Sequence, residues 1–226
     1  MECDHPCAFK CVALATSWGT IPRCPDGRAV RVPSAPNCTE ACLADTPQNL
    51  QTITLGGGCF WCTEAVFDRV RGVTDVESGY TNGHTVQPSY AQVCTGDTGH
   101  AEVVRLTFDA SEISLEEILE IFFHTHDPTT LNRQGNDVGT QYRSGIYFED
   151  PAHGEIAHAM VRQMSQDKLF GAPITTEVAP LHNYSPAEDY HQDYFANNPH
   201  AAYCAFVVGP KVEKFRKTFA RYLKPA

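Results

Sequence analysis

A short strand-like segment runs directly into a glycine turn and then into a helix-like segment near residue 59. Thr52–Leu55 favours a strand, glycines occupy positions 56–58, and Cys59–Phe67 has the composition of a helix start. Further strand-like runs follow at 73–80, 101–108, 144–148 and 174–178. They are not accompanied by repeated strand–helix–strand phasing or a G-x-G-x-x-G fingerprint. We therefore expect an α+β fold, a two-layer α/β sandwich, rather than a doubly wound sheet.

Capping signals and helical periodicity predict the helix boundaries. The Ser114–Glu117 capping box precedes apolar residues at helical spacing. Asp150–Pro151 opens a further helix, which Gly171 closes, and the first helix ends near Gly72. Lys211–Lys224 has the pattern of a basic amphipathic helix, and we expect its apolar face to pack on the domain and its polar face to be solvated.

Cysteine is distributed unevenly along the chain. Of the ten cysteines, six precede residue 50, in a segment that also holds six of the fifteen prolines and lacks a sustained apolar period. We expect residues 1–50 to be a Cys/Pro-rich extension and 51–226 to be the main domain. The early cysteines leave zinc ligation, disulfides and a poorly ordered segment open as alternatives; they are Cys3, Cys7, Cys11, Cys24, Cys38 and Cys42.

Charge and hydropathy argue against several classes of partner. The formal net charge of −10 argues against nucleic acid as the main partner. No apolar run approaches the roughly 20 residues of a membrane-spanning helix, and Glu2 and Asp4 stand where an export signal carries positive charge. The sequence predicts a soluble, cytoplasmic protein that does not bind membranes. A monomer is expected, since nothing indicates an interface.

Two residues stand out as chemical groups. Cys59 follows the glycines and opens a helix, so backbone N–H groups and the helix dipole are expected to lower the pKa of its thiol and make it a nucleophile. Glu102 shares the apolar face of the 101–108 strand, so burial is expected to raise its pKa and keep it protonated as a proton donor. The alternatives are an inert buried cysteine and a glutamate whose carboxylate reaches water.

Three motifs lie in order along the chain, at 58–64, 89–102 and 134–144. Together they resemble the A-type peptide methionine sulfoxide reductases over most of residues 51–224. The resemblance implies a ferredoxin-like two-layer domain for residues 51–226. It also implies reduction of the S epimer of methionine sulfoxide, both in proteins and as free methionine, in the repair of oxidative damage.

Positions that match the family's motifs receive roles from the resemblance. Cys59 matches the nucleophile that attacks the sulfoxide sulfur, and Glu102 matches the acid that protonates the sulfoxide oxygen. The remaining matches surround this pair. Tyr90 and Tyr142 match phenols that hydrogen-bond the sulfoxide oxygen. Asp137 matches a polar partner of the site, and Phe60 and Trp61 match the wall around the substrate methyl group.

After attack, Cys59 becomes a sulfenic acid that another thiol must reduce. Cys62 forms a C-x-x-C pair with it, and Cys204 matches the family's tail resolving cysteine, although an apolar segment follows Cys204 where relatives have a glycine-rich tail. The sequence leaves either cysteine, or a relay through both, open. Thioredoxin or a similar dithiol is implied as the external reductant, with no metal, flavin or nucleotide.

Two rival functions remain from the residues alone. A general thiol-disulfide oxidoreductase would use Cys59 and Cys62 but have no need of Glu102. A metal-binding or scaffold protein would work through the cysteines of the front segment. Histidines at 124, 126, 182 and 191 lack a recognised ligand framework, so a catalytic metal is not expected.

Overall fold

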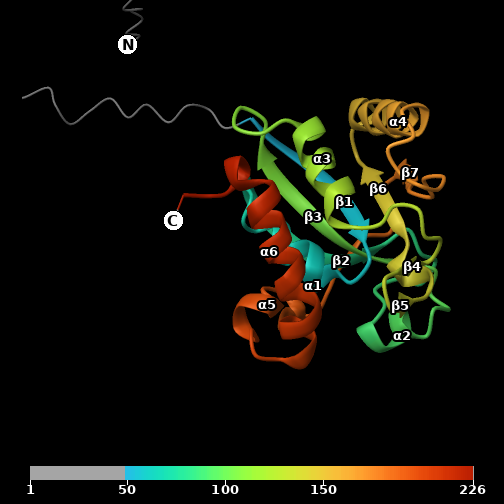
Figure 1. Ribbon diagram of the computed structural model, residues 1–226. Coiled ribbons are helices and arrows are strands. Elements are labelled where there is room, and N and C mark those ends of the chain that lie inside the picture. Colours follow the sequence, from blue (N-terminus) through green and yellow to red (C-terminus); the bar gives the residue numbers. More distant parts are fainter. Residues whose placement is uncertain (1–48, 226) are drawn as a thin grey trace, which may run out of the picture. The chain divides into compact units, whose positions relative to one another are not determined.

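The computed structural model describes residues 49–225, in which a mixed sheet carries helices on one face (Figure 1). The main sheet has the strand order β7-β6-β1-β3-β2-β8, and β4 pairs with β5 in a separate two-stranded sheet. The strands are β1 (Leu50–Gly57), β2 (Val73–Thr81), β3 (Ala101–Asp109), β4 (Arg133–Gln134), β5 (Asp137–Val138), β6 (Ser144–Phe148), β7 (Glu177–Pro180) and β8 (Ser185–Pro186).

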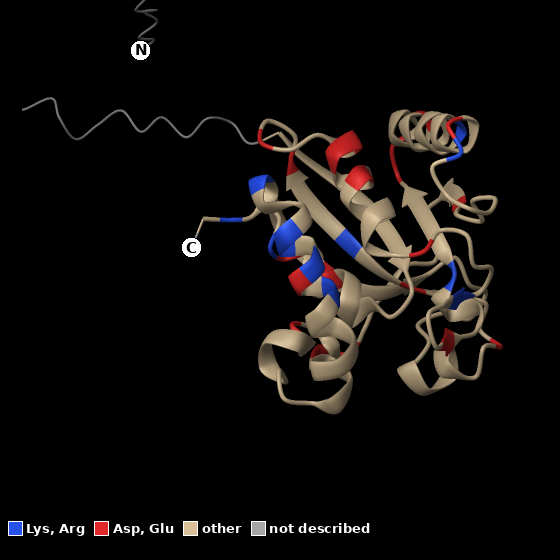
Figure 2. Cartoon of the chain, in the orientation of Figure 1, with Lys and Arg blue, Asp and Glu red and all other residues tan. Residues whose placement is uncertain are grey.

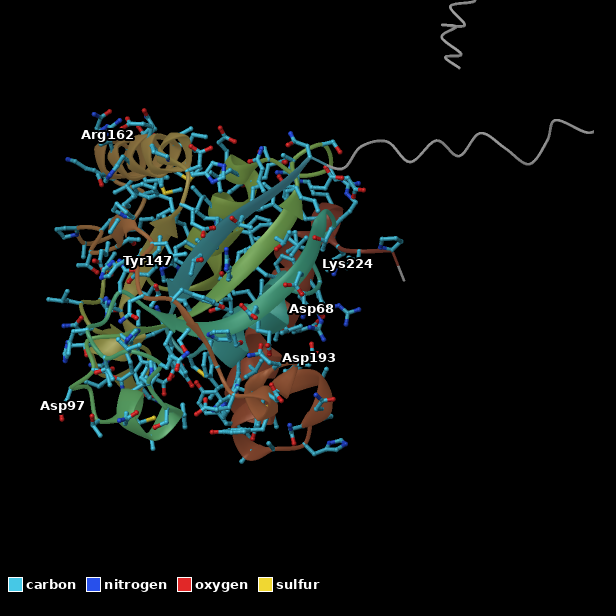
Figure 3. The ribbon with its side chains drawn as sticks, turned by 180° about the vertical axis from the view of Figure 1, so that it is seen from behind. Asp68, Asp97, Tyr147, Arg162, Asp193 and Lys224 are labelled. Carbon is cyan, nitrogen blue, oxygen red and sulfur yellow. The ribbon has the colours of Figure 1, made fainter. Side chains whose placement is uncertain are left out.

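Helices α1, α3 and α6 lie against the same face of the sheet, and the reverse view shows the central strands without a helix over them (Figure 3). This arrangement confirms the expected two-layer α+β fold. The helices are α1 (Phe60–Phe67), α2 (Tyr90–Cys94), α3 (Leu115–Thr125), α4 (Pro151–Gln166), α5 (Tyr194–Asn197) and α6 (Gly209–Thr218). Short 3-10 turns occupy η1 (Thr140–Tyr142), η2 (Asp189–His191) and η4 (Ala220–Tyr222), and a π-helical turn occupies η3 (Cys204–Val208).

Strand β1 is central because it pairs on both sides. It runs antiparallel to β3, with Leu55 opposite Val104, and antiparallel to β6, with Gly57 opposite Ser144. Only the β6–β7 pair is parallel among the strand pairs of the described chain, and α4 makes the crossover between them. The carboxyl end of β1, which leads into α1, is therefore held between two neighbouring strands.

The core forms where α1 and α3 meet the sheet. Ile118 and Phe122 of α3 and Leu55, Leu106 and Phe108 of the sheet are all fully buried. Burial of such large side chains stabilises the fold by roughly 1.5–3 kcal/mol each. The 101–108 alternation is confirmed, since its predicted apolar face is the face that the helices cover.

The predicted start of α3 is confirmed in detail. The Ser114 hydroxyl accepts a hydrogen bond from the Glu117 N–H at 3.2 Å, and the Glu117 carboxylate accepts one from the Ser114 N–H at 3.0 Å. The predicted start of α4 is confirmed as well, because Asp150 caps it through the Ala152 N–H at 2.9 Å.

Several predicted ends were wrong. Helix α1 stops at Phe67 rather than near Gly72. Helix α4 stops at Gln166 rather than Gly171, because Lys168 adopts a left-handed φ of 52° and turns the chain away. Strand β7 begins at Glu177 rather than at residue 174.

The C-terminal helix is also shorter than predicted. Helix α6 packs through Val212 and Phe215, as expected of its apolar face, but it ends at Thr218 instead of reaching Lys224. The reason is tertiary, since Leu223 forms a bridge with Val70 that draws the last residues out of the helical path.

The predicted extension over residues 1–50 and its six cysteines lie outside the described residues, apart from the last two positions, and stay predictions. Within the described part of the chain, no helix has the length and apolarity needed to cross a bilayer.

The α3 capping box gives a prediction for stability. Ser114→Ala removes the acceptor for the Glu117 N–H, so we expect the free energy of unfolding to fall by about 1 kcal/mol in urea denaturation followed by circular dichroism. Ser165→Ala is the matched control, since this exposed serine inside α4 bonds only the Val161 carbonyl. Its change is expected to stay within about 0.5 kcal/mol. Equal losses in the two variants would contradict a capping role.

Candidate active site

Cys59 occupies the N-cap position of α1, directly after the central strand β1. Gly58 makes this turn with a left-handed φ of +88°, and a Cβ at this position would lie 2.5 Å from a Gln134 side-chain carbon. A side chain therefore does not fit at residue 58. The thiol of Cys59 is almost fully buried at 8% exposure. The predicted strand–glycine–helix arrangement is confirmed.

Glu102 lies on β3 opposite Tyr80 of β2, and only 1% of its surface is exposed. One carboxyl oxygen, Oε2, accepts a hydrogen bond from the Phe60 N–H at 3.2 Å. The other, Oε1, has no partner among the described residues. Burial raises the pKa of this carboxyl to about 8, with further increases from the charges of Asp137 and Cys62. The prediction of a buried, protonated Glu102 is confirmed.

The predicted low pKa of the Cys59 thiol was wrong for this resting state. The pKa of Cys59 is raised, first because Cys59 is hydrogen-bonded to Cys62, then by burial and by the nearby Glu102 carboxyl. The first N–H of α1 is also occupied by Glu102 rather than by the thiol. The sequence placed the helix N-terminus correctly but gave no view of the groups that face it.

Cys62 takes the opposite shift. The pKa of its thiol is lowered to about 7, first by the hydrogen bond to Cys59 and then by the positive charge of Lys211, against the cost of burial. Two close thiols share one proton readily and release the second only with difficulty. The pair therefore releases its first proton more readily than its second.

The other predicted polar residues converge on Glu102. The phenols of Tyr90 and Tyr142 both have raised pKa values, first because of burial and then because of Glu102 and other nearby groups, so both remain O–H donors. Tyr90 opens α2 and its phenol is hydrogen-bonded to Cys94, whereas Tyr142 ends the η1 turn.

Asp137 brings in a residue that the sequence did not single out. Its Oδ2 accepts a hydrogen bond from the Tyr203 hydroxyl at 2.8 Å. The Tyr203 phenol is also hydrogen-bonded to Cys59, and its pKa is raised by burial and by the charges of Cys59 and Cys62. The position of Tyr203 beside Cys204 was the available signal in the sequence. The contact with Asp137 was not predictable, because the two residues are 66 positions apart.

Phe60 and Trp61 form an aromatic wall with rings from the tail of the chain. The Trp61 ring stacks on Tyr194 with ring centroids 3.7 Å apart and an angle of 7° between the planes. The rings of Trp61 and Tyr203 meet edge to face, with centroids 5.8 Å apart. Phe60 is buried against Tyr80, Tyr90 and His191. Such an apolar, polarisable surface suits an S-methyl group.

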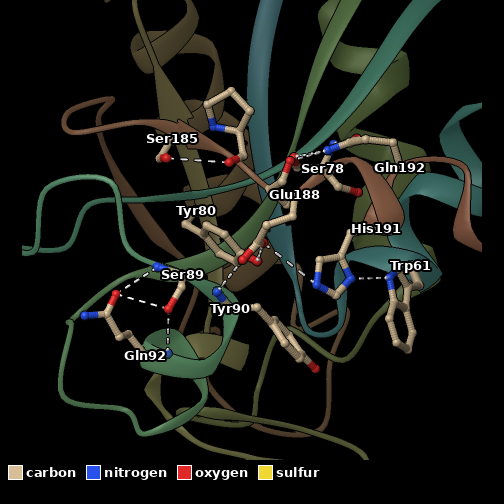
Figure 4. Close-up of polar contacts among 12 residues, drawn as sticks. Trp61, Ser78, Tyr80, Ser89, Tyr90, Gln92, Ser185, Glu188, His191 and Gln192 are labelled. Carbon is tan, nitrogen blue, oxygen red and sulfur yellow. Dashed lines mark hydrogen bonds and ion pairs between the residues drawn. The ribbon is translucent and has the colours of Figure 1, made fainter.

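A histidine and a carboxylate hold this wall in place (Figure 4). The Trp61 Nε1–H donates to His191 Nδ1 at 3.2 Å, so the proton of the neutral ring resides on Nε2, which lies 3.9 Å from the Glu188 carboxylate. Glu188 in turn accepts hydrogen bonds from the Tyr80 hydroxyl at 3.0 Å and the Tyr90 N–H at 2.8 Å. Glu188 thus holds the first residue of α2 close to the histidine that accepts the Trp61 N–H.

Glu64 was not recognised from the sequence, although it is a carboxylate in an otherwise apolar helix. It is 2% exposed and accepts hydrogen bonds from the Ser78 hydroxyl, the Asp193 N–H and the Tyr194 N–H. Burial raises its pKa to about 7. Glu64 therefore fastens α1 to the segment that supplies Tyr194 to the wall.

Cys204, the second resolving candidate, begins the π-helical turn η3 and is fully buried. Its pKa is raised by burial and by the charge of Cys62, and η3 packs against α1, the helix that carries Cys62. Cys94 is exposed on α2. Within residues 49–225, all four cysteines are free thiols, and no group of three or more His, Cys, Asp or Glu side chains could hold a metal ion.

Comparison with known proteins identifies one family. A family model described as peptide methionine sulfoxide reductase matches residues 51–223. A peptide methionine sulfoxide reductase from Ralstonia nicotianae is 55% identical over 181 residues, covering 78% of this chain and 95% of the relative. One from Saccharolobus solfataricus is 53% identical over 175 residues, covering 77% and 98%.

Solved structures give the same result. A Saccharomyces cerevisiae protein crystallised in reduced form is 38% identical with a TM-score of 0.62, covering 71% of this chain and 91% of its own. Methionine sulfoxide reductase A of Corynebacterium diphtheriae is 36% identical with a TM-score of 0.61, covering 70% and 78%.

The buried state of Glu102 predicts how stability depends on pH. The unfolded chain releases this proton near pH 4.5 and the folded protein near pH 8, so the folded state binds more protons between these values. The free energy of unfolding should fall as pH rises through this window, by up to about 1.4 kcal/mol per pH unit. Glu102→Gln lacks this titration. In urea denaturation, the free energy of unfolding of the variant should therefore increase relative to that of the native protein as pH rises.

The comparison of Glu102→Gln with the native protein isolates Glu102, because Glu64, whose pKa is about 7, titrates in both proteins. Glu155→Gln, at an exposed position on α4, is the matched control and should follow the native curve. A difference between native protein and Glu102→Gln that stays constant from pH 4.5 to 8 would mean that the carboxyl is already ionised in the fold.

Proposed function

The chain belongs to the peptide methionine sulfoxide reductase family, and we propose that Cys59 and Glu102 carry out its reaction on the S epimer of methionine sulfoxide. As a member of this family the protein is an oxidoreductase, and its substrates are proposed to be oxidised proteins and free methionine sulfoxide. The single observation that best supports the proposal is the neutral, buried Glu102 carboxyl, which is hydrogen-bonded to the residue that follows Cys59.

The proposed chemistry is a two-electron oxygen transfer. The sulfur of Cys59 attacks the sulfoxide sulfur while Glu102 donates its proton to the sulfoxide oxygen. The hydroxyl then passes from the substrate sulfur to the Cys59 sulfur while the S–S bond made by the attack breaks, so methionine leaves reduced and Cys59 becomes a sulfenic acid. The proton that the thiol releases restores Glu102. In the site without substrate, the raised pKa of Cys59 disfavours its thiolate. The partial positive charge on the sulfur of a bound sulfoxide favours the thiolate.

The surrounding residues support the same geometry. Tyr90 and Tyr142 remain protonated and are proposed to hydrogen-bond the sulfoxide oxygen as charge develops on it. Asp137 is proposed to orient Tyr203, whose hydroxyl donates to it. Phe60 and Trp61 are proposed to receive the substrate methyl group.

We propose that Cys62 resolves the sulfenic acid first and that Cys204 follows. The Cys62 thiol condenses with the Cys59 sulfenic acid to give a disulfide and water, and Cys204 then attacks Cys62 and releases Cys59. The hydrogen bond between Cys59 and Cys62 and the low pKa of Cys62 support the first step. The packing of η3, which begins at Cys204, against α1 supports the second.

A thioredoxin-type dithiol is proposed to reduce the final disulfide. The scheme requires no metal, flavin or nucleotide, because the thiols and the dithiol supply both electrons. This dependence on a reducing donor supports the cytoplasm as the compartment.

Epimer-specific mass spectrometry tests the reaction. With dithiothreitol present, the native protein should remove one oxygen from a peptide carrying the S epimer and none from the R epimer. Cys59→Ser should abolish the change. Native protein that is folded and reduced but alters neither epimer would refute the proposed activity.

Glu102→Gln tests the acid. Loss of the proton donor should lower kcat by 10²–10⁴-fold, on the order expected for general acid catalysis. The native rate should fall above pH 8 as Glu102 ionises near its pKa of about 8, and the variant should lose this alkaline decline. Glu155→Gln serves as the exposed control. Simple disulfide exchange should survive in Glu102→Gln, and a variant that also kept its sulfoxide reduction would overturn the role of Glu102 as the acid.

A single-turnover experiment without reductant tests the order of resolution. Cys204→Ser should accumulate the Cys59–Cys62 disulfide, mapped by peptide mass spectrometry. Cys62→Ser should accumulate the Cys59 sulfenic acid, trapped with dimedone. Formation of a Cys59–Cys204 disulfide in Cys62→Ser at the native rate would overturn this order.

A further inference from the structure

A groove opens between the end of α3 and helix α6, away from the aromatic wall. Its volume is about 290 Å³, and its lining includes His126, Gln134, Lys211, Lys214 and Phe215. This volume lies at the lower end of the range for small-molecule pockets. The groove therefore suits a compact ligand, and the scheme above makes no use of it.

A smaller cavity of about 10 Å³ lies beside this groove and shares lining residues with it. Cys62 lines the small cavity, and Thr125, His126 and Lys211 line both the cavity and the groove. Lys211 therefore stands between the groove and Cys62. Cys59 is not among the lining residues of either space, so a molecule that enters from the groove meets Cys62 first.

The charges of the groove favour an anion. Lys211 and Lys214 both line it, on a helix whose cationic residues are visible in Figure 2. His126 is neutral, because burial lowers its pKa to about 4 while its ring nitrogens contact the Phe122 carbonyl and the Ser144 hydroxyl.

The carboxylate that lines the groove is already engaged. Asp127 accepts two hydrogen bonds from Thr129, through its N–H at 2.9 Å and its hydroxyl at 2.6 Å. These bonds lower the pKa of Asp127 and keep it ionised, so two lysine charges against one carboxylate leave the groove positive. The same Lys211 acts on Cys62, since its charge favours the thiolate there.

We propose that this groove binds an anionic low-molecular-weight thiol of the glutathione type, which reduces the Cys59–Cys62 disulfide by attack at Cys62. The carboxylates of the thiol pair with Lys211 and Lys214, and rotation of the Lys211 side chain admits the sulfur to the small cavity. The inference rests on the proposed function for the origin of that disulfide. It gives the enzyme a second route of recycling besides a protein dithiol acting through Cys204.

The electron balance of the route is simple. The thiolate of the ligand attacks the Cys62 sulfur, the Cys59–Cys62 bond breaks, and Cys59 leaves as a thiolate. A second molecule of the thiol attacks the mixed disulfide on Cys62 and yields free Cys62 and the oxidised dimer of the thiol. Two thiols are oxidised for each disulfide reduced.

A charge-selectivity experiment tests the groove. The full chain carrying Cys204→Ser is oxidised to the Cys59–Cys62 disulfide, once with methionine sulfoxide and once with diamide, and is then reduced with glutathione or with uncharged 2-mercaptoethanol. Removal of both charges by Lys211→Gln with Lys214→Gln should slow glutathione by about 10-fold or more, the scale of electrostatic steering, and should slow 2-mercaptoethanol, whose only charge is its thiolate, much less. Lys217→Gln, exposed on the same helix outside the groove, is the matched control.

Four outcomes decide the matter. A glutathione rate that does not respond to the lysine substitutions, or a fall that is equal for the two reductants, would overturn the proposal. So would a glutathione adduct that mass spectrometry maps to Cys59 rather than Cys62. Charge-selective reduction of the diamide-made disulfide would support the groove even if methionine sulfoxide fails to produce that disulfide, which separates this proposal from the resolving order.

A second variant removes the dependence on the reductase reaction. Full-length protein with Cys59→Ser and Cys204→Ser keeps Cys62 as the thiol next to the groove. Glutathione disulfide should form a mixed disulfide on Cys62, located by peptide mass spectrometry, and the rate should fall with Lys211→Gln and with added salt. Reaction at Cys62 that is insensitive to both would refute binding in the groove.

Discussion

The site is organised around one desolvated carboxyl. Glu102 is 1% exposed, and its contact with the first N–H of α1 ties β3 to the helix that follows Cys59. A carboxylate at such a position would carry a large desolvation cost, whereas a neutral carboxyl with one hydrogen bond carries much less. The enclosure that makes this residue an acid near neutral pH is formed by the same sheet and helices that constitute the core.

Two further carboxylates extend this organisation to the tail of the chain. Glu64 binds the N–H groups of Asp193 and Tyr194, and Glu188 binds the Tyr90 N–H and lies beside His191. In each case residues from the tail complete a surface that begins on α1 or α2. Acidic side chains thus act here as backbone anchors, which explains how a wall built from distant segments keeps its shape.

Local patterns in the sequence were sufficient for the elements that depend on neighbours along the chain. The alternation in β3 predicted the burial of Glu102, and the capping box predicted the start of α3. Contacts between distant segments were not predictable in this way. Tyr203 meets Asp137 across 66 residues, and Leu223 ends the C-terminal helix by pairing with Val70. The Cys59 pKa was predicted with the wrong sign because it depends on the facing Cys62 and Glu102.

The central position of β1 has a consequence for co-translational folding. The residues that pair with this region are synthesised later. Glu102, which accepts the Phe60 N–H, lies 42 residues further along the chain, and Ser144, which is opposite Gly57, comes later still. Pairings of this range are slow to form and leave strand edges open in the nascent chain. Cys59 is therefore synthesised before the carboxyl of Glu102 is present. The site is complete only when the last third of the chain, which supplies Tyr194 and Tyr203, has been synthesised and has packed against α1.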